Sequence, residues 1–222
     1  MDVLQSAKKE LTASLLSDQP LQNRNSTAKK LKHVMEDIEL RVLAANPNDS
    51  HPLTHDFYST LLAVILISGN LDDARYLWKR LSHALKLHTE ILALHAIFKA
   101  LQMRKMAETY LIIEQTAWRT DFQPIIACLR GVLRDRVIQS IRETYLSIDI
   151  QLAAQMLGFS FVNADFQAFC HQIGWKLNTQ KSFLYPEPIA KEVEHPIKVA
   201  QLEDFAQSIL HLEENITSPA FS

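Results

Sequence analysis

The fold of this chain is decided by the stretch Gly69-Asn70-Leu71-Asp72-Asp73-Ala74-Arg75-Tyr76-Leu77-Trp78-Lys79-Arg80. Glycine readily adopts the left-handed backbone that often ends a helix, so an apolar helix over about 54–68 should stop at Gly69-Asn70. A second helix restarts at Leu71 or Asp72. Its inner stripe is Leu71, Ala74, Leu77, Trp78 and Leu81, with Arg75, Lys79 and Arg80 on the outer side. The stretch therefore predicts a helical hairpin.

The same helical spacing recurs on both sides of this hairpin. Apolar residues predict helices over about 89–102, 105–117 and 124–147 on its C-terminal side. On its N-terminal side they predict helices over about 3–17 and 26–45, the second capped by the hydroxyl of Ser26. Stacked antiparallel pairs of this kind favour a short helical solenoid.

The composition agrees with a helical protein that binds no polyphosphate. Only four of the 222 residues are glycine, whereas strand-rich folds need many turn glycines. The formal net charge of -2 provides no field to attract nucleic acid or an anionic membrane. The longest apolar run, 61–67, is too short to span a bilayer, and the first residues do not resemble a signal peptide. We expect no membrane association and a location in the cytoplasm and nucleus.

Shorter elements follow residue 148. Asp149 can cap a helix that Gly158 ends, and Asn163 can cap another that Gly174 ends. Two strand-like runs, 175–177 and 183–185, then flank a polar turn. A helix-turn-helix followed by a hairpin predicts a winged helix. The expected fold is thus mostly α, with a helical-repeat domain, a winged helix with a small β-hairpin, and a C-terminal helix.

Two segments predict surfaces that another chain could complete. Behind a proline-containing linker, a helix over about 197–215 carries a narrow apolar seam of Leu202, Phe205, Ile209, Leu212 and Ile216. This seam could fold back on its own domain or join a helical bundle with other subunits. The run Phe183, Leu184, Tyr185 is expected to form an outer strand whose free backbone groups a neighbour could extend. These side chains could equally pack inward.

The sequence carries no recognisable catalytic, cofactor or metal site. Phosphate-binding and nucleophile-elbow glycine motifs are missing from it. His51 and His55 have ligand-like spacing, but Pro52 prevents a regular helix through them and no third ligand is evident, which favours loop histidines. Cys128 and Cys170 lie in apolar helical patterns and are expected to be buried thiols. We therefore predict that the protein is not an enzyme and needs no cofactor.

A winged helix also reads DNA in many proteins, so nucleic-acid binding is the alternative from another class. The helix expected between Asn163 and Gly174 contains no lysine or arginine and one acid. A helix that enters a groove needs cations to offset phosphate charge. No nucleic-acid partner is expected.

The order of solenoid, winged helix and terminal helix resembles the PCI-type scaffold subunits of the proteasome lid, the COP9 signalosome and translation initiation factor 3. The block Ala74, Arg75, Tyr76, Leu77, Trp78 and Lys79 is similar to the Asn-Ala-Arg-Tyr-Leu-Trp-Lys-Arg signature of the COP9 signalosome subunit 8 family. Gln123-Pro124-Ile125, Gly174-Trp175 and Leu184-Tyr185-Pro186 extend the resemblance, which covers about 53–188.

This resemblance implies a non-catalytic scaffold subunit of a hetero-oligomer that removes Nedd8 from cullins. It implies winged helices joined edge to edge, terminal helices gathered in a shared bundle, and subunit 3 as the neighbour. The expected domains are 1–50 (two helices without an assigned role), 51–130 (helical repeats), 131–187 (winged helix) and 188–222 (linker and bundle helix). Subunit k of initiation factor 3 and the related proteasome lid subunit remain alternatives.

Overall fold

The computed structural model describes residues 6, 9–10, 12–15, 17, 20–45, 53–159, 164–178 and 182–186. The chain divides into two compact units, 1–187 and 188–222. The second unit lies outside the described residues, and with it the predicted helix over 197–215. The predicted loop over 46–52 and the cap Asn163 lie outside them as well.

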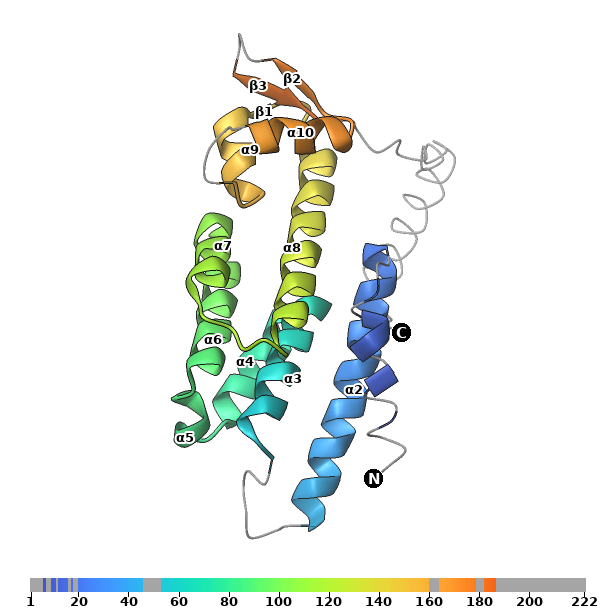
Figure 1. The fold of residues 1–222 in the computed structure, drawn as a ribbon, viewed down its shortest axis with the longest axis vertical. Coiled ribbons are helices and arrows are strands. Elements are labelled where there is room, and N and C mark those ends of the chain that lie inside the picture. Colours follow the sequence, from blue (N-terminus) through green and yellow to red (C-terminus); the bar gives the residue numbers. More distant parts are fainter. Residues whose placement is uncertain are drawn as a thin grey trace, which may run out of the picture. The chain divides into compact units, whose positions relative to one another are not determined.

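The helix α2 (Leu21–Ala45) begins five residues earlier than the sequence predicts. The N–H groups of Asn23 and Arg24 donate to the carbonyl oxygen of Pro20 at 3.0 and 3.1 Å. Proline suits a helix start, because its fixed φ matches the first turn and its missing N–H is not needed there. The predicted cap at Ser26 is therefore wrong, since this residue lies inside the helix. Helical spacing predicts an inner stripe of Ala28, Leu31, Met35, Ile38 and Val42 on α2. The first four are buried and Val42 is partly buried, and the helix packs on α3 (Figure 1).

The predicted hairpin is confirmed in detail. Helix α3 (His55–Ser68) ends at Gly69, which has φ +84° and donates its N–H to Ile65 O and Leu66 O. Helix α4 (Leu71–Arg80) follows, and the side-chain oxygen of Asn70 accepts a hydrogen bond from Asp73 N–H at 3.3 Å. Both helix ends are thus satisfied by local groups, which is why the sequence alone predicts this turn.

The rest of the helical region is built from α6 (Thr89–Gln102), α7 (Met106–Gln115) and α8 (Gln123–Thr144). All three were predicted. A further short helix, α5 (His83–Lys86), was not; the Ser82 hydroxyl caps it by accepting from Leu85 N–H. Among the described helices, none is both long enough and apolar enough to cross a membrane.

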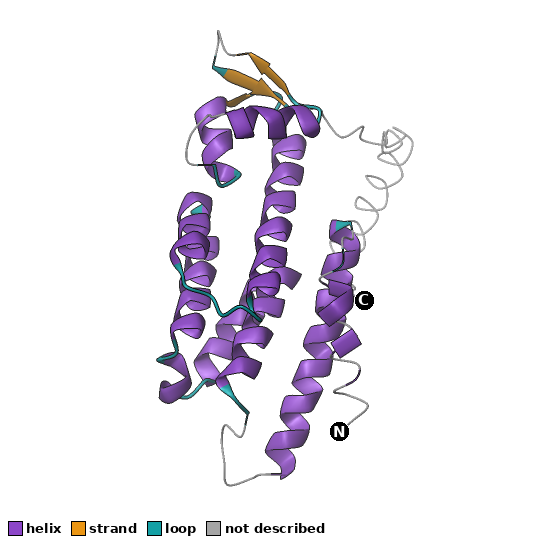
Figure 2. Ribbon diagram, viewed as in Figure 1, coloured by secondary structure: helices purple, strands orange, loops and turns teal. Residues whose placement is uncertain are grey.

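A winged helix follows at the C-terminal end of α8 (Figure 2). Helix α9 (Ile150–Met156) is capped by Asp149, whose carboxylate accepts from the N–H groups of Gln151 and Leu152, and α10 (Ala164–Gln172) follows. The predicted hairpin is β2 (Lys176–Asn178) and β3 (Phe183–Tyr185). An unpredicted third strand, β1 (Ile148–Asp149), pairs antiparallel with β3, so the strand order is β1-β3-β2.

Two apolar clusters fill the first unit. The larger lies among α2, α3, α4, α6 and the first half of α8, and the smaller lies among α9, α10, the strands and the second half of α8. Helix α8 contributes to both clusters, since Leu133 belongs to the larger and Val137 to the smaller. Met106 of α7 packs against each of them. The described residues confirm the predicted fold class: mostly helical, with a small antiparallel sheet.

Candidate protein-interaction surfaces

The block 74–79 divides between core and surface. Ala74 and Leu77 are buried, and the Trp78 ring stacks on His95 of α6 with 3.5 Å between ring centroids and 4° between planes. Lys86 Nζ lies 5.3 Å over the Trp78 ring. Burial, together with the charges of Lys99 and Lys86, lowers the pKa of His95 to about 4. This half of the block therefore joins α4 to α6.

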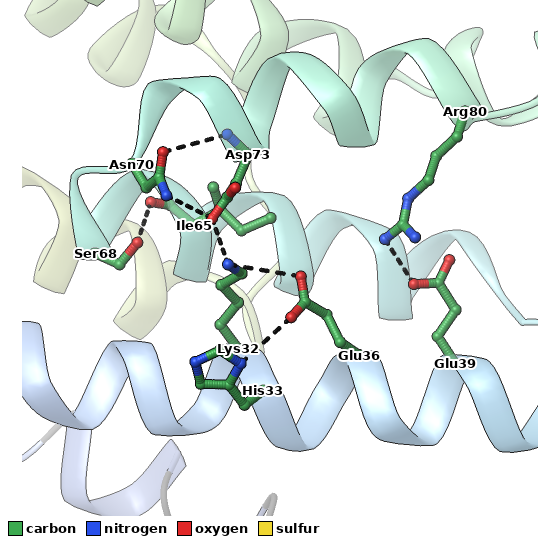
Figure 3. Close-up of polar contacts among 9 residues, drawn as sticks. All are labelled: Lys32, His33, Glu36, Glu39, Ile65, Ser68, Asn70, Asp73 and Arg80. Carbon is green, nitrogen blue, oxygen red and sulfur yellow. Dashed lines mark hydrogen bonds and ion pairs between the residues drawn. The ribbon is translucent and has the colours of Figure 1, made fainter.

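The opposite side of α4 is held to α2 by two ion pairs (Figure 3). Lys32 binds the Asp73 carboxylate, which also accepts from Asn70 Nδ2 at 2.7 Å. Arg80 binds Glu39 with 2.7 Å between Nη2 and Oε2. The Glu39 side chain is only 5% exposed, and Arg80 is half-exposed. The sequence placed Arg80 on the outer side, but the structure shows that it neutralises a buried carboxylate.

The remaining residues of the block face outward, as predicted. Arg75, Tyr76 and Lys79 are exposed, and Tyr76 presents 64% of its surface. Two of these side chains are cationic and one is aromatic. Together they form a surface that could contact another chain.

The position predicted for Phe183, Leu184 and Tyr185 at the edge of the sheet is wrong. Their strand, β3, is the middle strand: Leu184 lies opposite Ile148 of β1 on one side and Leu177 of β2 on the other. The run 148–149 is only two residues long, too short to be recognised as a strand from the sequence, and without it β3 is expected at the edge of the sheet. Among the described strands, β1 and β2 form the edges.

The side chains of β3 alternate between core and solvent. Leu184 is fully buried in the smaller cluster, whereas Phe183 and Tyr185 are 42% and 40% exposed on the opposite face of the sheet. Close to this sheet in the chain, Leu146 is 88% exposed. The wing therefore presents an aromatic pair on its outer face. We call Phe183 and Tyr185 the wing face.

The seam Leu202, Phe205, Ile209, Leu212 and Ile216 lies outside the described residues.

The described part of the chain brings together little that could do chemistry. It contains no group of three or more histidine, cysteine or acidic residues able to hold a metal ion. His55 is the first residue of α3, and its ring stacks on that of His88 with centroids 4.1 Å apart. Its Nε2 lies 3.0 Å from Asp56 Oδ1. Burial raises the pKa of both thiols, that of Cys170 to about 11. Neither cysteine resembles an activated nucleophile.

The exposed residues of α10 are also unlike those of a DNA-reading helix. Phe166 and Cys170 are buried, and the exposed positions include Asp165, Gln167 and His171, with no lysine or arginine in the helix. Phosphate contacts would have to come from elsewhere.

Sequence reasoning missed a groove beside Gly69, where the side chain of Arg136 closes over the α3–α4 turn. No local signal connects these positions, which are far apart in the chain. The sequence shows only that Arg136 lies among apolar positions of the predicted helix 124–147.

Comparison with known proteins places the chain in a family. The model described as the CSN8/PSMD8/EIF3K family matches residues 52–194. COP9 signalosome complex subunit 8 of Danio rerio is 27% identical over 157 residues, covering 68% of this chain and 81% of that protein. The protein of the same name from Emericella nidulans is 23% identical and covers 78% and 82%, and that from Dictyostelium discoideum is 26% identical and covers 73% and 83%. The family model matches well over half of the chain, and the protein therefore belongs to the CSN8/PSMD8/EIF3K family.

Proposed function

We propose that the protein is a non-catalytic scaffold subunit of the COP9 signalosome and supports assembly of the complex that removes Nedd8 from cullins. The observation that carries this proposal is the family match over 52–194, together with relatives from fish, fungus and amoeba that are all named COP9 signalosome complex subunit 8. The resemblance of residues 74–79 to the signature of that family supports the same subunit.

The surfaces favour a role in binding proteins. The wing face exposes two aromatic rings, and large aromatic side chains are enriched where protein interfaces bury apolar area. Within the described residues, Cys170 is buried and Cys128 partly buried, burial raises the pKa of both thiols, and no metal-binding cluster is present. An architectural role needs none of these groups.

The proposed arrangement assigns a role to each region from residue 51 onward. Residues 51–130 form the helical repeats, 131–187 the winged helix and 188–222 the linker and terminal helix, while 1–50 have no assigned role. The winged helix would meet its neighbour through an edge of the sheet. In the strand order β1-β3-β2, the edges among the described strands are β1 and β2. The terminal seam would enter a shared helical bundle, with subunit 3 as neighbour, in a hetero-oligomer of the cytoplasm and nucleus.

Two alternatives share the family. Subunit k of translation initiation factor 3 and a proteasome lid subunit would have the same fold and a different set of partners. A nucleic-acid-binding winged helix is the distant alternative, and the absence of cations on α10 counts against it.

Affinity purification of the full-length tagged chain from its own cells tests the assignment. Cullin-deneddylase subunits should co-purify with it and diminish when residues 197–222 are removed. Recovery of initiation factor or proteasome lid subunits instead would overturn the proposal in favour of the corresponding alternative.

Replacement of Phe183 or Tyr185 by aspartate tests the wing face. Both residues are partly exposed, so the substitution should reduce recovery of the complex without unfolding the chain. Leu92→Asp on α6 is the matched control, because Leu92 is similarly exposed and lies outside the proposed surface. If the wing-face and control variants assemble equally well, the wing face is not an interface.

A further inference from the structure

A groove of about 610 Å³ opens where the α3–α4 turn, the α6–α7 turn, α8 and α9 meet. Its wall is largely apolar, with Leu71, Leu101, Met106, Leu133 and Met156 among the lining residues. This volume is within the range of cavities that hold ligands or anchoring side chains. Two arginines, Arg104 and Arg136, also line it, and no aspartate or glutamate does.

Arg136 contributes a cation that no carboxylate neutralises within the described part of the chain. Its guanidinium donates to Leu66 O at 3.2 Å, to Asn25 Oδ1 at 2.9 Å and to Ile67 O. All three acceptors are uncharged amide oxygens. The Arg136 side chain is partly buried, and this burial lowers its pKa. A charge in this position favours an incoming anion.

Arg104 stands on the other side of the groove, in the turn between α6 and α7. It has φ +57°, a left-handed conformation that is uncommon for arginine, and its N–H donates to Leu101 O at 3.0 Å. The side chain is exposed, and no ion pair to it is found among the described residues. Its neighbour Met103 is 66% exposed, which extends apolar surface beyond the groove.

We propose that this groove docks an acidic amphipathic helix of another protein. The apolar side chains of that helix would lie on the leucine and methionine wall, and a carboxylate would approach Arg104 and Arg136. Helix-in-groove binding uses apolar anchors spaced by three or four residues, and a neighbouring acid gives orientation and specificity. A nucleic-acid strand fits less well, because an apolar wall offers nothing to its phosphates. This partner surface goes beyond the scaffold assignment and does not depend on it.

Site-specific crosslinking in cells can identify the occupant. Ser140 lines the groove and is exposed, so the photoreactive residue p-benzoylphenylalanine can replace it in the full-length chain. The crosslinked peptide should be helical in pattern and carry aspartate or glutamate beside its apolar positions. Arg104→Glu in the same chain should reduce the crosslink at least tenfold. Arg41→Glu, which reverses an exposed charge on α2 outside the groove, should leave it unchanged.

The captured segment, made as a labelled peptide, then gives the affinity for the purified chain. Arg104→Glu should weaken binding at least tenfold, and replacement of the acid in the peptide by arginine should restore binding to this variant. The proposal is overturned if Ser140 captures only residues 197–216 of its own chain, a basic segment, nucleic acid or nothing. It is equally overturned if Arg104→Glu and Arg41→Glu act alike. Because the assembly test has a separate readout, either proposal can fail without the other.

Discussion

Replacement of Gly158 by alanine should destabilise the joint between the helical region and the winged helix. Gly158 follows α9 at φ +79°, and an alanine Cβ there would lie 2.6 Å from Tyr110 Cγ and 2.7 Å from Cδ2. Tyr110 belongs to α7 and is 98% buried, so its ring has little freedom to retreat. The substitution therefore combines backbone strain with a steric clash between two elements.

The size of the effect follows from these two contributions. A left-handed backbone costs a non-glycine residue roughly 1–2 kcal/mol, and overpacking of a filled site costs roughly 1–3 kcal/mol more. Gly69→Ala is the matched control. Its φ is +84°, but its Cβ would meet the end of the long Arg136 side chain at 3.0 Å, which a small shift relieves. We expect Gly158→Ala to cost about 3 kcal/mol and Gly69→Ala about half as much.

Urea unfolding followed by circular dichroism measures both losses, and thermal unfolding should show a drop in Tm of roughly 6–12 °C for Gly158→Ala. In a Tyr110→Ala background the clash disappears, so Gly158→Ala should there cost only the backbone contribution. Equal costs for Gly158→Ala and Gly69→Ala, or an unchanged cost of Gly158→Ala in the Tyr110→Ala background, would refute the steric reasoning.

Three further predictions concern single contacts. Arg80→Met should lower the unfolding free energy by about 2 kcal/mol, because the buried Glu39 carboxylate loses its Arg80 partner. In a double-mutant cycle followed by urea unfolding, Arg80→Met combined with Glu39→Gln should cost less than the sum of the two single variants. An additive result would show that the two groups are uncoupled. The folded pKa of His95, about 4, is below its unfolded value of 6.5, so its contribution to stability is full above pH 6.5 and is lost as pH falls toward 4. His95→Phe keeps the stack on Trp78 but cannot be protonated. The loss of unfolding free energy between pH 7 and pH 4.5 should therefore be smaller in this variant by about 1–2 kcal/mol, after allowance for solvent screening. The same pH dependence in both proteins would contradict this. Cys170, with its pKa raised to about 11, should resist iodoacetamide at pH 8 in the folded protein and react in urea, as mass spectrometry can show. Rapid modification of the folded protein would mean that the Cys170 thiol is accessible to the reagent.

The α3–α4 hairpin shows what sequence reasoning predicts well. Its turn depends on a glycine that takes φ +84° and on an asparagine that caps the next helix, and both act within four residues of their own position. Asp149 before α9 follows the same rule. Such turns and caps can be predicted without knowledge of the rest of the molecule, because the hydrogen-bond donors and acceptors that pair are close together in the sequence.

The start of α2 shows where two local signals compete. Ser26 is a good cap, but Pro20 also suits a helix start, and the residues between them continue the helix. Helical spacing correctly placed Ala28, Leu31, Met35 and Ile38 in the core without settling where the helix begins. The ends of a helix are therefore predicted less reliably from sequence than the face that it buries.

The sequence by itself determined the order of helices, the hairpin of the wing and the family resemblance, because each is written in local spacing or in a contiguous motif. Tertiary structure alone decided that β3 is the middle strand, since its partner β1 is only two residues long and Ile148 of β1 lies 36 positions before Leu184, the residue it faces. It also decided that Arg80 neutralises Glu39 and that Arg136 meets the α3–α4 turn. These contacts join residues that are distant in the chain, and only packing of the whole domain brings such groups within bonding distance.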